Sequence, residues 1–519
     1  MNLRLLPALS LLLAPVLLPA ESSRHVVVLV WDGMRPDFVS PANTPNLAQL
    51  AASGVFFARH HPVYLSSTEV NATAMATGAY PAHSGIIANN DYRPEIDPLK
   101  AIEVQALEIV RRGDQVHDNH YLEQPTLAER LRAHGLPTAI AASKAVGVLH
   151  DRAERAAGAG VSPVLFAGQT LPAPLGSSLA QALGVFPAAG AHDDKTALDD
   201  WTTQALLQSL WSKEVPAYTL LWFAEPDSSQ HATGPGSPQS LEAIRHSDRQ
   251  LGLVLAELDR RGLRATTDVM VVSDHGFSTI ERKVDVAAEA SQAGFQAKRA
   301  VLGSLQPGEI MIVSNGGSSL CYVGNHDAAV TARFATWLQG QDWTGVVLAR
   351  DALPGTFPLS AVHLDSPHAP DLVVSFRWNA GKSATGTPGL QASDLGATSK
   401  KVGNHASLSP YDMHNTLVAA GPDFRKGFTD DLASANTDLA PTILWLLGFQ
   451  DEATHLDGRV LGEALTITAP PTRAPASQRL VAHTPVTGGT WEQYLQVSEV
   501  NGVRYLDEGN GALQPAPAK

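Results

Sequence analysis

Three short apolar runs along the chain each end at an aspartate. The runs "HVVVLVW", "YTLLWFAEP" and "DVMVVS" stand directly before Asp32, Asp227 and Asp274. Short runs of this kind are typical of strands buried on both faces of a parallel sheet. Helical patterns separate them, in 44–53, 126–135, 240–262 and 437–448. This alternation predicts an α/β fold with a mostly parallel central sheet and helices on both faces.

The three aspartates should lie near one another. In open α/β sheets, ligands bind beyond the carboxyl ends of the strands. A single aspartate at a strand end usually serves only as a turn or helix cap. Three strand-end acids that reach the same edge therefore indicate a functional site more strongly than any one of them does.

Two later segments differ from this pattern. The segment 281–400 mixes strand-like runs with a helical run, which predicts a small α/β cap inserted into a catalytic domain of 24–465. A Pro-rich linker opens the segment 466–519, and Asn501-Gly502 then stands between alternating runs. An Asn-Gly pair in that setting predicts a β-hairpin.

The N-terminus predicts export. The chain begins with one arginine, an apolar run of signal-peptide length and Ala20 ahead of polar residues. We interpret 1–20 as a cleaved signal peptide and expect a periplasmic or secreted protein. Prolines interrupt the apolar run, so we expect no stable membrane insertion of the mature chain.

The net charge limits the possible partners. It is −14 at pH 7 over 519 residues, whereas nucleic-acid polymers and anionic membranes require clustered Lys and Arg. We therefore expect a small-molecule substrate and no nucleic-acid polymer. The single cysteine, Cys321, excludes an intramolecular disulfide and reads as a buried structural thiol.

Histidines stand close to two of the strand-end aspartates and once more near the end of the expected domain. The candidate ligands are Asp32, Asp227, His231, Asp274, His275 and His405. A mixture of Asp and His suits Zn²⁺ or a similar transition ion better than Mg²⁺ or Ca²⁺. These residues are enough for two ions, and two ions can clamp the attacking and leaving oxygens of a displacement at phosphorus.

A nucleophile is available in the stretch "VYLSSTEVNATAMATG", residues 63–78. It offers three adjacent hydroxyl groups, on Ser66, Ser67 and Thr68. A hydroxyl held against a metal ion loses its proton more easily and becomes a nucleophile. The residue types alone leave all three as candidates.

Taken together, these motifs resemble a known family. "VVVLVWDGMRPD", "TEVNATAMATGAYPAHSGI", "EPDSSQH", "VVSDHGF" and "GNH" with "VAAGPDF" are similar to the metal-dependent phosphodiesterase and nucleotide pyrophosphatase branch of the alkaline phosphatase superfamily. The resemblance covers about 25–450 and implies an alkaline-phosphatase-like fold with two zinc ions. It implies that Asp227, His231 and His405 hold one zinc. The second zinc would be held by Asp32, Asp274, His275 and the nucleophile.

The resemblance also implies roles for three further residues. Counting back from the shared "TG" at 77–78, the nucleophile falls on Thr68. Asn71 falls where the family has an amide that contacts a phosphoryl oxygen. Lys144 stands in a place comparable to a lysine that reaches the transferring group in phosphomonoesterase and phosphonoacetate-hydrolase relatives. Those relatives have a second cation two residues later, where this chain has Val146.

We therefore predict an exported hydrolase of phosphoric esters, of the phosphodiesterase and nucleotide pyrophosphatase type. A phosphomonoesterase or phosphonate hydrolase of the same superfamily is the alternative that Lys144 favours. A sulfatase fits less well, because Cys321 lacks the C/S-x-P-x-R motif of the modified nucleophile. A secreted binding protein that has lost catalysis should lack ligands, and all the predicted ligands are present.

Overall fold

The computed structural model of the chain describes residues 24–152, 162–471 and 473–515. The predicted signal peptide, 1–20, lies outside the described residues. Within them the chain forms one large sheet and four smaller ones. None of the described helices has the length and apolar character that a membrane crossing requires.

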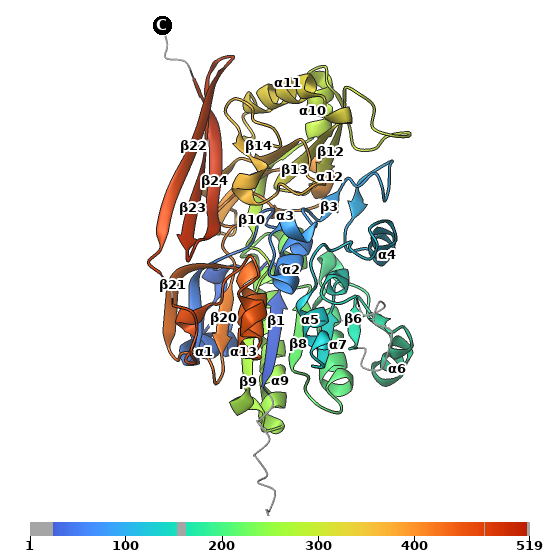
Figure 1. Cartoon of the computed structure of the whole chain (residues 1–519), viewed down its shortest axis with the longest axis vertical. Helices are drawn as coiled ribbons and strands as arrows, with labels where there is room; N and C mark the ends of the chain where they lie inside the picture. The colour runs from blue at the N-terminus through green and yellow to red at the C-terminus, as the bar shows by residue number, and fades with distance from the viewer. Residues whose placement is uncertain (1–23, 153–161, 472, 516–519) are drawn as a thin grey trace, which may run out of the picture.

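The central sheet has nine strands in the order β21-β2-β20-β9-β1-β8-β5-β6-β7 (Figure 1). Parallel pairing joins β9, β1, β8, β5 and β6 in one row and β2 to β21, while β20 and β7 pair antiparallel. The bounds are β1 His25–Trp31, β2 Val55–His61, β5 Thr138–Ala142, β6 Val164–Phe166, β7 Gln169–Leu171, β8 Tyr218–Phe223, β9 Thr267–Val272, β20 Leu417–Ala420 and β21 Phe428–Ala435. The sheet is mostly parallel, as predicted.

Helices cover both faces of this sheet, which confirms the predicted α/β class. Alternate residues of a strand point to opposite faces, so Val28 of β1 packs into one core and Leu29 into the other. The Val28 face is covered by α2 Thr68–Thr77, α4 Leu107–Val116, α5 Leu127–Ala133, α13 Leu439–Leu446 and α14 Gln450–Ala453. The Leu29 face is covered by α1 Pro45–Ser53, α6 Pro174–Leu183, α7 Thr196–Ala205 and α9 Pro238–Arg260.

A second, six-stranded sheet lies above the first in Figure 1, and we call it the cap sheet. Its strands are β11 Gln296–Lys298, β12 Glu309–Ser314, β13 Ser318–Val323, β16 Leu372–Phe376, β14 Thr344–Ala349 and β15 Phe357–Pro358. Two helices, α10 Val286–Gln292 and α11 Ala328–Gln339, pack on one face of it.

Shorter elements lie between the two large sheets. A four-stranded sheet contains β17 Trp378–Lys382, β18 Pro388–Asp394, β10 Ser278–Val284 and β19 Gly403–Asn404, and β3 Asn90–Asp91 pairs with β4 Ile102–Glu103. The remaining short helices are α3 Pro81–Ser84, α8 Asp227–Thr233 and α12 Leu395–Thr398.

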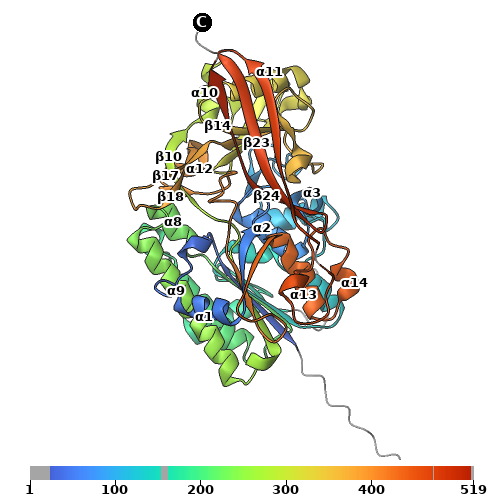
Figure 2. The ribbon, with the colours of Figure 1, turned by 90° about the vertical axis from the view of Figure 1, so that its left-hand side faces the viewer.

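The C-terminal segment forms a three-stranded antiparallel sheet of β22 Ala476–Val486, β23 Gly489–Val500 and β24 Val503–Pro515. Figure 2 shows it at the front of the molecule, over the cap sheet, and its strands β23 and β24 contact β14 of the cap sheet and β21 of the central sheet. Gln493 of β23 bonds through both side-chain ends to the backbone of Val347 in the cap sheet. Asn501 and Gly502, both at positive φ, form the turn between β23 and β24. The domain boundaries drawn from the sequence stay predictions.

One buried arginine connects the C-terminal sheet to the central domain. Arg459 is 7% exposed, and its Nε donates to Tyr505 Oη of β24 at 2.8 Å. Its two terminal nitrogens pair with Glu463 at 2.6 and 2.8 Å. Removing one partner of a buried ion pair leaves the other charge uncompensated, which costs about 3–5 kcal/mol.

Arg459→Met should therefore lower the free energy of unfolding by about 3 kcal/mol, measured by urea denaturation followed by tryptophan fluorescence. Arg479→Met is the matched control, because Arg479 is an exposed residue of the same sheet whose guanidinium stacks on Tyr494. The control should change stability by less than about 1 kcal/mol. Equal effects of the two substitutions would show that Arg459 does not fasten the sheet.

Candidate metal centre

The carboxyl ends of three adjacent strands deliver the three aspartates to one edge of the central sheet. Strand β1 pairs with β8 on one side and with β9 on the other. Asp32 follows β1, Asp227 begins α8 shortly after β8, and Asp274 follows β9. All three are at most 4% exposed. The strand pairing therefore brings together residues that lie more than 240 positions apart in the chain.

One group of predicted ligands gathers around Asp227. His231, one turn later on α8, has its Nε2 3.2 Å from Asp227 Oδ1. His405, in the loop after β19, has its Nε2 3.6 Å from the same oxygen. These are the three residues that the resemblance assigned to one ion.

The second group gathers around His275. Its Nε2 lies 3.2 Å from Asp274 Oδ2, 3.7 Å from Asp32 Oδ1 and 3.3 Å from Thr68 Oγ1. The His275 ring also stacks on the His405 ring, with centroids 3.6 Å apart, so His275 adjoins both groups. We assign it to the second group, because its Nε2 faces the oxygens of that group.

The three histidines share one arrangement of protons. Nδ1 of His231, His275 and His405 lies 2.8–3.0 Å from a backbone carbonyl oxygen. A carbonyl oxygen only accepts, so each ring carries its proton on Nδ1 and presents a lone pair on Nε2. Burial lowers the pKa of His231 and His405, which keeps those rings neutral. Neutral imidazole is the form that binds metal ions.

Each lone pair faces a carboxylate oxygen, which is also an acceptor. Asp32 Oδ1, Asp227 Oδ1 and Asp274 Oδ2 are buried and make no hydrogen bond within the described residues. Acceptors that converge in this way lack the positive charge that would satisfy them. The donor set therefore fits cations, and its mixture of imidazole and carboxylate fits zinc.

Lys144 supplies part of that positive charge. It follows β5, and its Nζ lies 2.8 Å from Asp32 Oδ2 and 3.2 Å from Asp227 Oδ2, which connects the two ligand groups. Burial and the carboxylate of Asp274 raise the pKa of Asp32, and the ammonium of Lys144 opposes them. For Asp227, burial raises the pKa and the ammonium of Lys144 lowers it. Lys144 is thus a residue of the site and not of the outer surface.

The structure distinguishes the three candidate hydroxyl groups. Thr68 is the first residue of α2 and lies against His275 and the open cavity. Ser66 Oγ donates to Ser407 O at 2.9 Å, and neither Ser66 nor Ser67 is among the residues that line the cavity. Only Thr68 therefore combines a place among the ligands with access from the cavity.

The geometry assigns Asn71 to the nucleophile loop and not to the substrate. Its Oδ1 accepts from Val63 N at 2.8 Å and from Asn436, and its Nδ2 donates to three backbone carbonyl groups of the loop. The side chain is completely buried. Its amide has no donor left for a phosphoryl oxygen. Asn71 therefore does not make the phosphoryl contact that the family resemblance implied.

Asn89, which the sequence argument missed, lines the cavity beside Thr68. Its Oδ1 accepts from Glu69 N at 3.1 Å in the first turn of α2. Spacing along the chain could not identify Asn89, because it lies 21 positions after Thr68. The chain returns to the cavity only after α3. The loop "IIANND" carried no ligand signal of its own.

The cavity above the metal centre has a volume of about 530 Å³. Four lysines line it: Lys144, Lys195, Lys400 and Lys401. Lys401 Nζ lies 3.2 Å from His231 Nε2, and burial lowers its pKa. Glu69, Asp193 and Asp227 also line the cavity. In a protein with a net charge of −14, the four lysines therefore offset these acids where an anionic substrate would enter.

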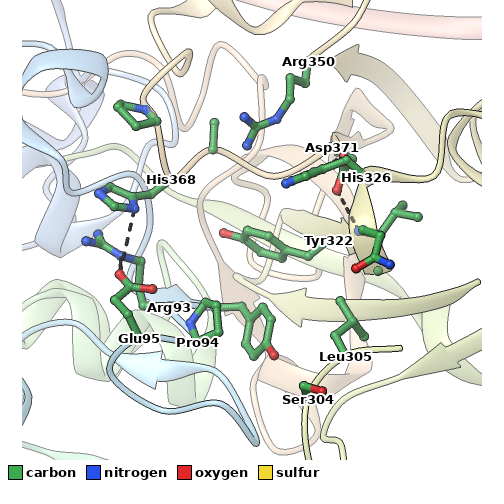
Figure 3. A pocket seen from close by; sticks show the side chains of 16 residues that line it. Arg93, Pro94, Glu95, Ser304, Leu305, Tyr322, His326, Arg350, His368 and Asp371 are labelled. Atoms are coloured by element: carbon green, nitrogen blue, oxygen red, sulfur yellow. Dashed lines mark hydrogen bonds and ion pairs between the residues drawn. The ribbon is translucent and has the colours of Figure 1, made fainter. Parts of the chain in front are cut away.

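A second cavity, of about 360 Å³, lies between the loop 92–95 and the cap sheet (Figure 3). Arg93 and Asp371 on its walls already have partners: Arg93 Nε donates to Glu95 at 2.7 Å, and Asp371 accepts from Val323 N at 2.7 Å. The residues that line it include no predicted metal ligand. We therefore place the candidate site in the larger cavity.

Comparison with known proteins agrees with this geometry. The family model "Type I phosphodiesterase / nucleotide pyrophosphatase" matches residues 26–407. Human ectonucleotide pyrophosphatase/phosphodiesterase family member 7 is 24% identical over 280 residues, 53% of this chain and 54% of that protein. Human family member 5 is 22% identical over 457 residues, 85% of this chain and 78% of that protein. The chain thus spans only about half the length of some relatives.

Solved structures show the same fold. Murine ectonucleotide pyrophosphatase / phosphodiesterase 5 superposes with a TM-score of 0.58 at 18% identity, over 82% of this chain and 95% of that one. A second structure of the murine protein, an inactive variant with one threonine replaced by alanine, is a complex with AMP and superposes with a TM-score of 0.57. The expected alkaline-phosphatase-like architecture is confirmed.

The hydrogen bond from Trp222 to Asp32 gives a test of the centre. Trp222 Nε1 donates to Asp32 Oδ2 at 2.9 Å and fixes that carboxylate. Trp222→Phe should weaken zinc binding about 10-fold, because lost support of a ligand typically costs 10–100-fold in metal affinity. Zinc titration against a competing chelator measures this.

Trp211→Phe is the matched control. Trp211 is equally buried and its Nε1 donates to Thr219 at 3.1 Å, away from the ligands. It should lose the same ring volume and leave zinc affinity unchanged. If both variants bind zinc as the native chain does, Asp32 is not a ligand that Trp222 positions.

Proposed function

The chain belongs to the type I phosphodiesterase/nucleotide pyrophosphatase family, and from that membership we propose that it is an exported hydrolase of phosphoric ester or phosphoanhydride bonds with Thr68 as its nucleophile. The position of Thr68 carries the proposal. Its Oγ1 lies 3.3 Å from His275 Nε2, at the start of a helix and at the floor of a lysine-lined cavity. The murine relative is described as inactive when one threonine is replaced by alanine, which supports a threonine as the nucleophile here.

We propose two zinc ions as the cofactors. Asp227, His231 and His405 would hold one, and the other would lie among Asp32, Asp274, His275 and Thr68. The unpartnered carboxylate oxygens and the three Nε2 lone pairs support this assignment. Bound there, the ions supply positive charge that stabilises the phosphoryl oxygens and lowers the pKa of the Thr68 hydroxyl.

The reaction proceeds in two displacements at phosphorus. Thr68 loses its proton to solvent, its Oγ1 forms a bond to phosphorus in line with the leaving oxygen, and the leaving oxygen departs with the electron pair of its P–O bond and takes up a proton from solvent. A water molecule then attacks the phosphothreonine from the vacated side and loses a proton to solvent. The bond from Oγ1 to phosphorus breaks, and Oγ1 takes up a proton, which restores the Thr68 hydroxyl. Each step exchanges one P–O bond for another, so no external oxidant or cofactor is consumed.

Three features of the chain hold the phosphoryl oxygens during these steps. The N-terminus of α2, where Thr68 is the first residue, carries a partial positive charge beside the site of attack. Lys144 Nζ stands between the two ligand groups. The Oδ1 of Asn89 accepts from Glu69 N, which leaves Nδ2 of Asn89 to contact a phosphoryl oxygen, the role that the resemblance gave to Asn71.

The substrate we propose is a diester or pyrophosphate of the nucleotide type. The relatives are named nucleotide pyrophosphatases and phosphodiesterases, and the murine relative binds AMP. Lys195 and Lys400 line the cavity beyond Lys144 and would meet further negative charge on such a molecule. The "ecto" relatives and the signal-like N-terminus support export.

Lys144 keeps a phosphomonoesterase or phosphonate hydrolase as the second candidate. A monoester carries one more negative charge than a diester and needs more compensation. Lys144 lies within 3.2 Å of both groups of ligands, where it could give that compensation. Rates on an aryl monoester, an aryl diester and a phosphonate separate the two candidates, and a clear monoester preference would reverse our choice.

Thr68→Ala should reduce kcat on an aryl diester by at least about 10³-fold, because it removes the atom that attacks phosphorus. Ser66→Ala and Ser67→Ala should keep most of the rate. All three variants should fold and bind zinc, which metal analysis of the purified proteins checks. Loss of activity in Ser67→Ala with activity kept in Thr68→Ala would move the nucleophile to Ser67.

Replacing Lys195 and Lys400 together by Ala should raise KM for a dinucleoside pyrophosphate about 10-fold, since each contact to a partly exposed charge contributes about 0.5–1 kcal/mol. KM for a singly charged aryl methyl phosphate should stay within about 2-fold of the native value. Lys382→Ala, on exposed strand β17, is the matched control. Equal shifts for both substrates would show that the lysines do not select for extra negative charge.

A further inference from the structure

A third group of two histidines and an aspartate lies outside the cavity described above. His61 is the last residue of β2, His414 lies in the loop before β20, and Asp507 belongs to β24. One potential ligand atom of each lies within 4.8 Å of the others. The group thus connects the central sheet to the C-terminal sheet.

His61 has the same proton arrangement as the three histidines of the metal centre. The ring is completely buried, and Nδ1 lies 3.1 Å from Ser434 O, which only accepts. Its Nε2 lies 3.0 Å from Asp507 Oδ1 but forms no well-directed hydrogen bond within the described chain. Two acceptors at that distance repel each other unless a second proton or a metal ion satisfies both.

His414 favours the metal ion over the proton. Its ring meets His61 edge-on, with centroids 4.7 Å apart, and its Nε2 is buried without a partner among the described residues. A proton on His61 would satisfy Asp507 alone, whereas a metal ion takes a ligand from all three side chains.

We propose that His61, His414 and Asp507 bind one structural zinc ion, separate from the catalytic centre. Two imidazoles and one carboxylate form a donor set that zinc prefers, with a water as the fourth ligand. Ligands of one tetrahedral zinc lie about 3.3 Å apart, given zinc–ligand distances of about 2.0–2.1 Å. The His61–Asp507 pair is close to this spacing at 3.0 Å, and a ring nitrogen of His414 lies within 4.8 Å of both atoms.

Arg59 is the charged neighbour that such an ion must tolerate. Its Nη2 lies 3.2 Å from Asp507 Oδ1 and 2.7 Å from Ser498 Oγ. Its side chain is 38% exposed, so it can keep Ser498 and solvent as partners while Asp507 Oδ1 turns to the ion. Ser498 also donates to Asp507 Oδ2 at 2.8 Å and holds the other oxygen in place.

The ion would fasten β24 to the end of β2, directly before the nucleophile loop. His60, next to His61, contacts Ser434 and Asn436 through its two ring nitrogens. Asn436 in turn donates to Asn71 Oδ1 and to Asp274 O. The site therefore stabilises the scaffold of the catalytic loop without contacting the substrate.

Counting zinc in the full-length chain tests the proposal. Native protein and variants are saturated with zinc, freed of excess by gel filtration and analysed by mass spectrometry for zinc per chain. His414→Gln and Asp507→Asn should each bind one zinc fewer than the native protein. His83→Gln, at an exposed histidine paired with Asp457, should bind as many as the native protein.

A second measurement separates this site from the catalytic one. In a chain that combines His231→Ala, His405→Ala and His275→Ala, which removes ligands of both proposed catalytic ions, added zinc should still raise Tm, and further addition of His414→Gln should abolish the rise. If His414→Gln does not fold, Asp507→Asn carries the comparison. An unchanged zinc count in a folded His414→Gln or Asp507→Asn chain overturns the proposal, whatever the state of the catalytic centre.

Discussion

The site depends on acceptors that face one another in a buried place. Carboxylate oxygens of Asp32, Asp227 and Asp274 meet the Nε2 lone pairs of His231, His275 and His405. Burial makes both kinds of group costly unless positive charge lies between them. The strands bring the carboxylates together, and hydrogen bonds to backbone carbonyl groups place the histidine protons on Nδ1. Lys144 provides a positive charge between Asp32 and Asp227, and Lys401 Nζ lies beside His231. The fold thus places these acceptors where a bound cation would stabilise them.

The sequence predicted the parts of this arrangement that follow from strand ends. Buried parallel strands expose their carboxyl ends at one edge, so an aspartate directly after β1 or β9 has few other places to go. His231 follows from Asp227 by one helical turn. The class of fold and the pairing of Asp227 with His231 were therefore accessible from apolar pattern and spacing, whereas the assignment of His405 and His275 to different ions came from the family resemblance.

Side chains placed by loops were not accessible in this way. Asn71 in α2 and Asn89 in the loop after α3 are the same residue type. Only their hydrogen bonds show that Asn71 supports the nucleophile loop, whereas Asn89 lines the cavity. Lys401 reaches His231 because the four-stranded sheet returns the chain to α8. Such contacts depend on long-range packing, about which local periodicity carries no information.

The C-terminal sheet is attached to two parts of the molecule, the cap sheet and the central domain. Gln493 holds it to the cap sheet, and Arg459 holds it to the central domain. The cap sheet and the central domain are thus both attached to the C-terminal sheet, and moving them apart would break these hydrogen bonds. The width of the cavity opening therefore depends on hydrogen bonds that lie outside the cavity itself, in a sheet that provides none of its lining residues.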